Sequence, residues 1–226
     1  SLEEAGELRD SIQIKVYGSE DISKWVSEYP GVALHALEFV AASPPAGAMT
    51  WQEWEGYKFN SRLPYLETPE RRAIQDQLRT KLADECVVSR LVGQSGVGKS
   101  RLITELFRRF ETAEDRALRA MAVFVPNGDR QFEDLENIVK QWRREGLRVL
   151  LIVDDCSREN HDLLAAEANH STSRLSLLTI DYNVDRARGL GSPEVVELDP
   201  FSGEQMNTLI ASIGLGDSAE ADRIVK

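Results

Sequence analysis

Residues 87–100 read VVSRLVGQSGVGKS, a short apolar run that leads directly into a glycine-rich turn. The turn satisfies the spacing GxxxxGK(S/T), and a helical pattern follows it. Glycines at these positions let successive backbone N–H groups face inward, and the start of a helix adds partial positive charge. A polyanion is the natural occupant of such a loop. We therefore predict a phosphate-binding loop between a strand and a helix.

Two residues of this loop carry the chemistry. Lys99 places an ammonium against the β- and γ-phosphates of a nucleotide, and Ser100 offers its hydroxyl to Mg²⁺. We predict ATP or ADP and Mg²⁺ as cofactors. The residues expected to contact the nucleotide are Gly93, Gln94, Ser95, Gly96, Val97, Gly98, Lys99, Ser100 and Arg101.

A second motif lies at residues 149–155, which read VLLIVDD. Ligands of open α/β sheets bind beyond the carboxyl ends of the strands, so the two carboxylates should face the phosphates. This is the pattern of a Walker B strand. We expect Asp154 to hold Mg²⁺, and Asp155 to orient or deprotonate the attacking water. Lys99 and Asp155 are thus the predicted catalytic residues.

Short apolar runs alternate with helical patterns along most of the chain, which predicts an α/β fold with a mainly parallel, five-stranded sheet. Thr68 and Pro69 provide the start signal of a helix before the first strand. The expected strands are 87–92, 118–125, 149–153, 175–180 and 195–198, with helices at 99–110, 132–142 and 162–169 between them.

The chain outside this alternation falls into smaller pieces. A strand at 12–16 and helices from Asp21 and from Pro30 form a small α+β unit. Trp51, Trp54 and other aromatic residues then follow without clean periodicity, which we interpret as a connector with aromatic anchors. A helical stripe after Pro200 begins a helical lid. The predicted divisions are 1–42 as the tail of an upstream domain, 43–67 as connector, 68–200 as core and 201–226 as lid.

The strand at 175–180 ends in polar residues that could sense the γ-phosphate if this strand lies beside the phosphate-loop strand. Thr179, Asp181 and Asn183 are the candidates, although each reads equally well as an ordinary loop-entry residue. Arg186 and Arg188 could stabilise transition-state charge. We favour the interpretation that both are solvated surface arginines, because charged side chains in loops usually face water.

The 226 residues carry a net charge of −11, which does not favour a surface built for nucleic-acid phosphates, although a local basic patch stays open. Cys86 and Cys156 have no metal-ligand spacing. No signal peptide and no membrane-length apolar run is visible. We expect a cytoplasmic protein without membrane attachment, and we interpret the chain as a fragment because residue 1 is Ser and the last helical pattern stops midway.

The order of these motifs, closed by the stretch 197–204 (ELDPFSGE) before a helix, resembles the STAND branch of the AAA+-related ATPases. The resemblance covers about 68–226. It implies an ATP-dependent switch that forms homo-oligomers, with an effector domain upstream and a ligand sensor downstream. It also implies that Pro200 packs near the nucleotide base. The segment 12–39 and the tryptophan-containing connector are similar to the region that precedes the ATPase in bacterial antiviral STAND proteins.

The strand ending at Ile180 departs from that pattern, because Asp181 follows where several branches have an arginine. Other readings of the motifs stay open. A GTPase or small-molecule kinase would also use a phosphate loop, although no guanine-reading NKxD motif is visible. A scaffold that binds nucleotide without turnover is the alternative outside the enzymes.

Overall fold

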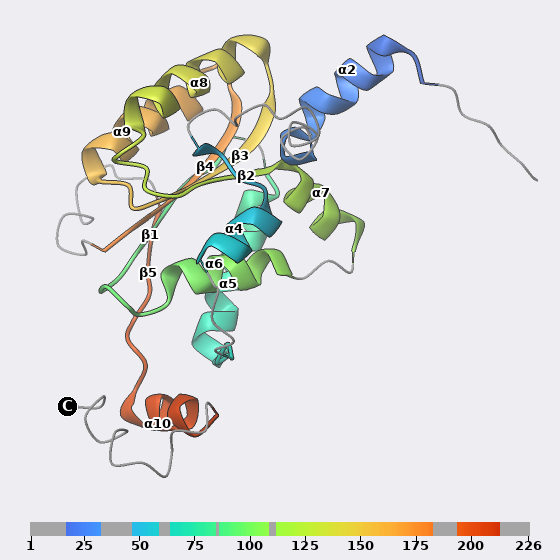
Figure 1. Cartoon of the computed structure of the whole chain (residues 1–226). Helices are drawn as coiled ribbons and strands as arrows, with labels where there is room; N and C mark the ends of the chain where they lie inside the picture. Colours follow the sequence, from blue (N-terminus) through green and yellow to red (C-terminus); the bar gives the residue numbers. More distant parts are fainter. Residues whose placement is uncertain are drawn as a thin grey trace, which may run out of the picture.

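A five-stranded parallel sheet forms the centre of the computed structural model (Figure 1), as predicted. The strand order is β2-β3-β4-β1-β5, so the phosphate-loop strand lies between β4 and β5. The strands are β1 Val88–Val92, β2 Ala122–Val125, β3 Arg148–Asp154, β4 Arg174–Asp181 and β5 Glu194–Glu197. The structure describes residues 17–32, 47–58, 64–84, 86–108, 112–182 and 194–212.

Helices cover both faces of the sheet, and alternate strand residues enter two separate cores. The first core joins one face to the helices α4 to α7, and the second joins the other face to α8 and α9. This burial on both sides explains why the strands read as nearly continuous apolar runs. The described helices are α2 Ser19–Glu28, α4 Trp51–Lys58, α5 Pro69–Leu82, α6 Lys99–Arg108, α7 Ala113–Met121, α8 Phe132–Glu145, α9 Arg158–Ala168 and α10 Gly203–Ser212.

Residues at the start of a helix fix where that helix begins. The hydroxyl of Thr68 accepts a hydrogen bond from the amide of Arg71, and Pro69 occupies the first turn of α5, as predicted. α10 begins at Gly203, where the sequence predicts the lid helix. None of the described helices is long and apolar enough to cross a bilayer.

The starts of two predicted core elements are wrong by four residues. The expected strand 118–125 begins only at Ala122, because a capping box between Thr112 and Asp115 starts α7 and its buried Leu118 and Met121 belong to that helix. The helix expected at 162–169 starts earlier, at Arg158, because the hydroxyl of Ser157 caps it.

The expectation of irregular structure in the connector is also wrong for residues 51–58, which form α4. Trp54 is fully buried, and its indole N–H donates a 3.0 Å hydrogen bond to the hydroxyl of Thr104 on α6. Trp54 also stacks on Phe124 of β2. The aromatic anchors are present, but tertiary packing rather than a periodic pattern makes this short segment helical.

Residues 47–58 are tied to the sheet as well. Met49 and Phe124 exchange two backbone hydrogen bonds of 2.7 and 2.9 Å in an isolated antiparallel bridge at the edge strand β2. Further upstream, α2 confirms a helix near Asp21 but not its predicted start, because α2 begins at Ser19 and the Asp21 carboxylate accepts a hydrogen bond from the amide of Gly18. The predicted strand at 12–16 lies outside the described residues, and the domain divisions stay predictions.

Candidate functional site

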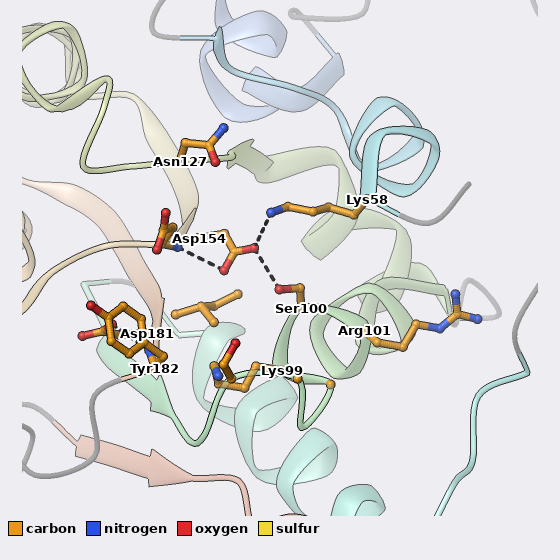
Figure 2. Close-up of a pocket in the computed structure, with 13 residues that line it drawn as sticks. Lys58, Lys99, Ser100, Arg101, Asn127, Asp154, Asp181 and Tyr182 are labelled. Carbon is orange, nitrogen blue, oxygen red and sulfur yellow. Dashed lines mark hydrogen bonds and ion pairs between the residues drawn. The ribbon is translucent and has the colours of Figure 1, made fainter. Parts of the chain in front are cut away.

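A pocket of about 340 Å³ opens at the carboxyl ends of β1, β3 and β4 (Figure 2). The two predicted motifs meet here because β3 and the phosphate-loop strand both flank β4. Three cationic side chains and three carboxylates line the pocket, together with small loop residues. The lining residues are Lys58, Ser95, Gly96, Gly98, Lys99, Ser100, Arg101, Asn127, Asp154, Asp155, Ile180, Asp181 and Tyr182.

The phosphate loop has the backbone that its glycines permit. Gly96 and Gly98 have φ values of +83° and +91°, a region that residues with a side chain rarely adopt. Gly93 is required for a different reason, which is close packing: a Cβ added there would lie 2.5 Å from the carbonyl oxygen of Leu198. These glycines bring the loop around to the start of α6, where the first amides of a helix have no acceptor within the helix.

Lys99 is the first residue of α6, and its side chain folds back over the loop. The ammonium donates hydrogen bonds of 2.8 Å to the carbonyl oxygens of Gly93 and Gln94. Burial lowers the pKa of Lys99 from its ordinary value, whereas the nearby carboxylates of Asp154 and Asp181 act to raise it. The ammonium thus lies in the pocket with carbonyl partners that a phosphate group could replace.

Ser100 of the first motif and Asp154 of the second lie in contact. The hydroxyl of Ser100 donates a 2.8 Å hydrogen bond to Oδ2 of Asp154, and the amide of Asp155 donates to Oδ1 at 3.1 Å. Asp155 itself is exposed, lines the pocket and has a φ of +56°. This backbone conformation is uncommon for a residue with a side chain, and its occurrence beside a pocket suits a functional role.

The donor set fits a hard divalent cation. Hydroxyl and carboxylate oxygens are the ligands that Mg²⁺ prefers, and Mg²⁺ at phosphate sites takes only one or two of them from the protein. Among the described residues, no group of three or more His, Cys, Asp or Glu side chains could hold a metal alone. A Mg²⁺ ion held by Ser100 and Asp154 would take its remaining ligands from phosphate and water.

Asp181 is the sensor candidate that reaches the pocket. Its carboxylate accepts a 2.5 Å hydrogen bond from Arg90 of β1 and another of 2.6 Å from the amide of Tyr182. Thr179 does not line the pocket; its hydroxyl lies 3.2 Å from the Arg90 guanidinium and 2.7 Å from Nδ1 of His161. Asn183 and the arginines at 186 and 188 lie outside the described residues.

His161 and Cys156 belong to the same buried region behind the pocket. Burial, helped by the positive charge of Arg90, lowers the pKa of His161 to about 4, so the ring is neutral near pH 7. Burial also raises the pKa of the Cys156 thiol to about 12. Neither residue lines the pocket.

Some predicted contact residues do not line the pocket. Val97 is buried, and its carbonyl oxygen accepts a 2.7 Å hydrogen bond from Arg71. The Arg71 guanidinium also lies 3.8 Å from the ring centroid of Phe201, which links the phosphate loop to the start of the lid. Pro200 precedes this contact and is exposed, so its role stays a prediction. The predicted contact residues away from the pocket are Gly93, Gln94, Val97 and Pro200.

Sequence reasoning missed Lys58 and Asn127. Asn127 follows β2 at the same edge of the sheet, so the strand-end rule that selected Asp154 would also have found it. Lys58 had no such signal, because it ends α4 and reaches the pocket only through tertiary packing. The Lys58 ammonium lies 2.9 Å from Oδ2 of Asp154.

No family model matches the chain, and no curated protein does. Among solved structures, a chain of Drosophila ORC bound to DNA is similar with a TM-score of 0.50 and 19% identity, over 75% of this chain and 51% of that one. Rhizobiales Trip13 matches with a TM-score of 0.42 and 14% identity, over 71% of this chain and 78% of the Trip13 chain. The chain spans about half the length of the ORC chain that it matches. The likeness to ORC shows the fold alone, the α/β fold of P-loop NTPases that the sequence predicts.

Proposed function

We propose that this chain is a Mg²⁺-dependent ATP-binding and hydrolysing switch module of the STAND type. The observation that carries the proposal is the convergence of Lys99, Ser100 and Asp154 on one pocket beside a glycine loop. An ammonium, a hydroxyl and a carboxylate beside a helix N-terminus match the groups that bind a nucleoside triphosphate and its cation.

Each residue of the pocket would have a role that follows from its position. Lys99 would leave the carbonyl oxygens of Gly93 and Gln94 to contact the terminal phosphates. Ser100 and Asp154 would hold Mg²⁺, which neutralises phosphate charge when it is bound. Asp155 lies exposed at the pocket edge, where a carboxylate can accept a proton from water. Asp181 is held rigidly by Arg90 and can accept a hydrogen bond from a water at the terminal phosphate.

Control of assembly by the nucleotide is the finer part of the proposal. Arg71 donates to the Val97 carbonyl of the phosphate loop and also lies over the ring of Phe201, which shortly precedes α10, so movement of the loop would reach the lid. The motif order supports the STAND assignment and a role in signalling or antiviral defence. Mass measured by light scattering should rise with a non-hydrolysable ATP analogue relative to ADP if this part holds.

Release of phosphate tests hydrolysis. We expect the chain to release phosphate from Mg·ATP in preference to Mg·GTP, slowly, because charge-stabilising residues supplied by a second subunit can add about 10³–10⁵ in rate. Asp155→Ala should lower the turnover by about 10²–10⁴-fold, the usual contribution of a general base, and leave the dissociation constant of ATP nearly unchanged. Tight ATP binding with no release above the Asp155→Ala background would identify a nucleotide-binding scaffold instead.

A further inference from the structure

Lys58 enters the nucleotide pocket from outside the predicted core. Its ammonium contacts Oδ2 of Asp154 at 2.9 Å, and the hydroxyl of Ser100 contacts the same oxygen at 2.8 Å. Figure 2 shows the two interactions meeting at one carboxylate, with Lys58 approaching from the side of α4. A positive charge therefore lies beside the two oxygen atoms that fit a divalent cation.

The position of Lys58 is supported by its helix. Trp54, one turn earlier, is fully buried against α6, and its ring centroid lies 5.1 Å from the Lys58 ammonium. The hydroxyl of Tyr57 accepts a 3.3 Å hydrogen bond from Asn127, another residue of the pocket. The exposed fractions of the Lys58 and Asp154 side chains are only 23% and 9%. This ion pair is therefore partly removed from solvent, unlike the surface pairs that contribute little.

Charge balance explains why a cation is needed there. The ammonium of Lys99 donates to two loop carbonyls, whereas Lys58 makes the direct contact with Asp154. A carboxylate that is 9% exposed beside a phosphate site would repel an incoming polyanion unless a cation compensated it.

We propose that Lys58 is an intramolecular counter-ion that takes the place of the divalent cation on Asp154 until Mg²⁺ arrives with the nucleotide. The proposal rests on the nucleotide-binding function proposed above. Lys58 then has two effects on binding. It compensates Asp154 when nucleotide binds without Mg²⁺, and it competes with Mg²⁺ for the same carboxylate oxygen.

Both effects change one measurable ratio, the dissociation constant of a nucleotide in EDTA divided by that in saturating Mg²⁺. Removal of the charge by Lys58→Met should weaken binding in EDTA and leave Mg²⁺ without a competitor. We expect the ratio to rise about tenfold, and the Mg²⁺ concentration at half-saturation to fall by a similar factor, as linkage requires. Lys58→Arg, which keeps a cation at this position, should stay close to the parent.

The experiment measures binding of N-methylanthraniloyl-ADP by fluorescence to the parent, Lys58→Met, Lys58→Gln and Lys58→Arg. Lys140→Met is the matched control, because Lys140 pairs with Glu136 on α8 outside the pocket. Thermal unfolding shows which variants are folded, and Lys58→Gln replaces Lys58→Met if the latter is not. A ratio in the charge-removed variants equal to or below that of the parent overturns the role of Lys58. Absence of binding by the parent in Mg²⁺ would instead overturn the proposed function.

Discussion

The guanidinium of Arg90 donates a 2.5 Å hydrogen bond to the carboxylate of Asp181 across the neighbouring strands β1 and β4. Exposed fractions are 3% for the Arg90 side chain and 7% for that of Asp181. The same guanidinium donates to the carbonyl oxygen of Cys156 at 3.1 Å. One buried cation thus fixes the end of β4 and the segment after β3, and both border the pocket.

Arg90→Met should therefore lower the free energy of unfolding by about 3–5 kcal/mol, because it leaves a buried carboxylate without its partner. The double variant Arg90→Met with Asp181→Leu should recover much of this loss, since an apolar pair avoids the uncompensated charge. Urea unfolding measures both. The control is Arg143→Met, whose partly exposed pair with Glu167 should contribute at most about 1 kcal/mol. Equal losses in the two single variants would contradict a special role for Arg90.

A second prediction concerns pH, because the pKa of His161 is about 4 in the native protein and its ordinary value is 6.5. Between these values the unfolded chain binds a proton that the native protein does not, so stability falls as the pH falls. The parent should lose about 2 kcal/mol of unfolding free energy through this group between pH 7 and pH 5.

His161→Asn removes the titrating ring and should lose correspondingly less over the same interval in urea unfolding. The comparison concerns the slope with pH, since the substitution also changes packing at a buried site. Identical slopes for the two proteins would show that His161 titrates normally in the fold.

The burial of Trp54 predicts that the residues before the predicted core are needed for its stability. Trp54→Ala removes a fully buried indole and its bond to Thr104, and should cost about 3–5 kcal/mol. Tyr57→Ala, on the same helix but at an exposed ring, should cost less than about 1 kcal/mol. Thermal unfolding of a chain that starts at Pro64 should show a lower midpoint than the parent. Unchanged unfolding would make α4 an independent connector, as the sequence suggested.

The two cysteines should differ in reactivity. Cys86 is exposed, whereas Cys156 is buried with a thiol pKa of about 12. A disulfide reagent at pH 8 should modify one thiol per native chain and two per unfolded chain, because only the thiolate reacts. Fast modification of both in the native protein would place Cys156 near solvent.

The sheet and the two phosphate-binding motifs could be predicted because their signals are local. Gly96 and Gly98 are required by the backbone of one turn, and Asp154 follows directly from the end of a buried strand. Leu118 was assigned to a strand because apolar residues at the end of an amphipathic helix run into the next strand without a break. The capping box that starts α7 was the overlooked signal.

The rest of the site depends on contacts between distant segments. Lys58 and Asp154 are far apart in sequence, and a helix of eight residues with weak periodicity brings them together. Arg90 reads as an interruption of an apolar strand, and only the neighbouring Asp181 explains why a cation lies there. Such pairs cannot be found from the pattern of a single segment.

The loop before α6 should bind a nucleoside triphosphate through Lys99. Calorimetric titration of the chain with Mg·ATP tests it most directly, with Lys99→Ala as the variant and Lys140→Ala as a surface control of the same chemistry. We predict saturable binding by the parent and the control, and at least a tenfold weaker affinity for Lys99→Ala, since a charge-assisted contact to phosphate contributes about 1.4 kcal/mol or more. Equal affinities for the parent and Lys99→Ala, or no binding by the parent, would contradict it.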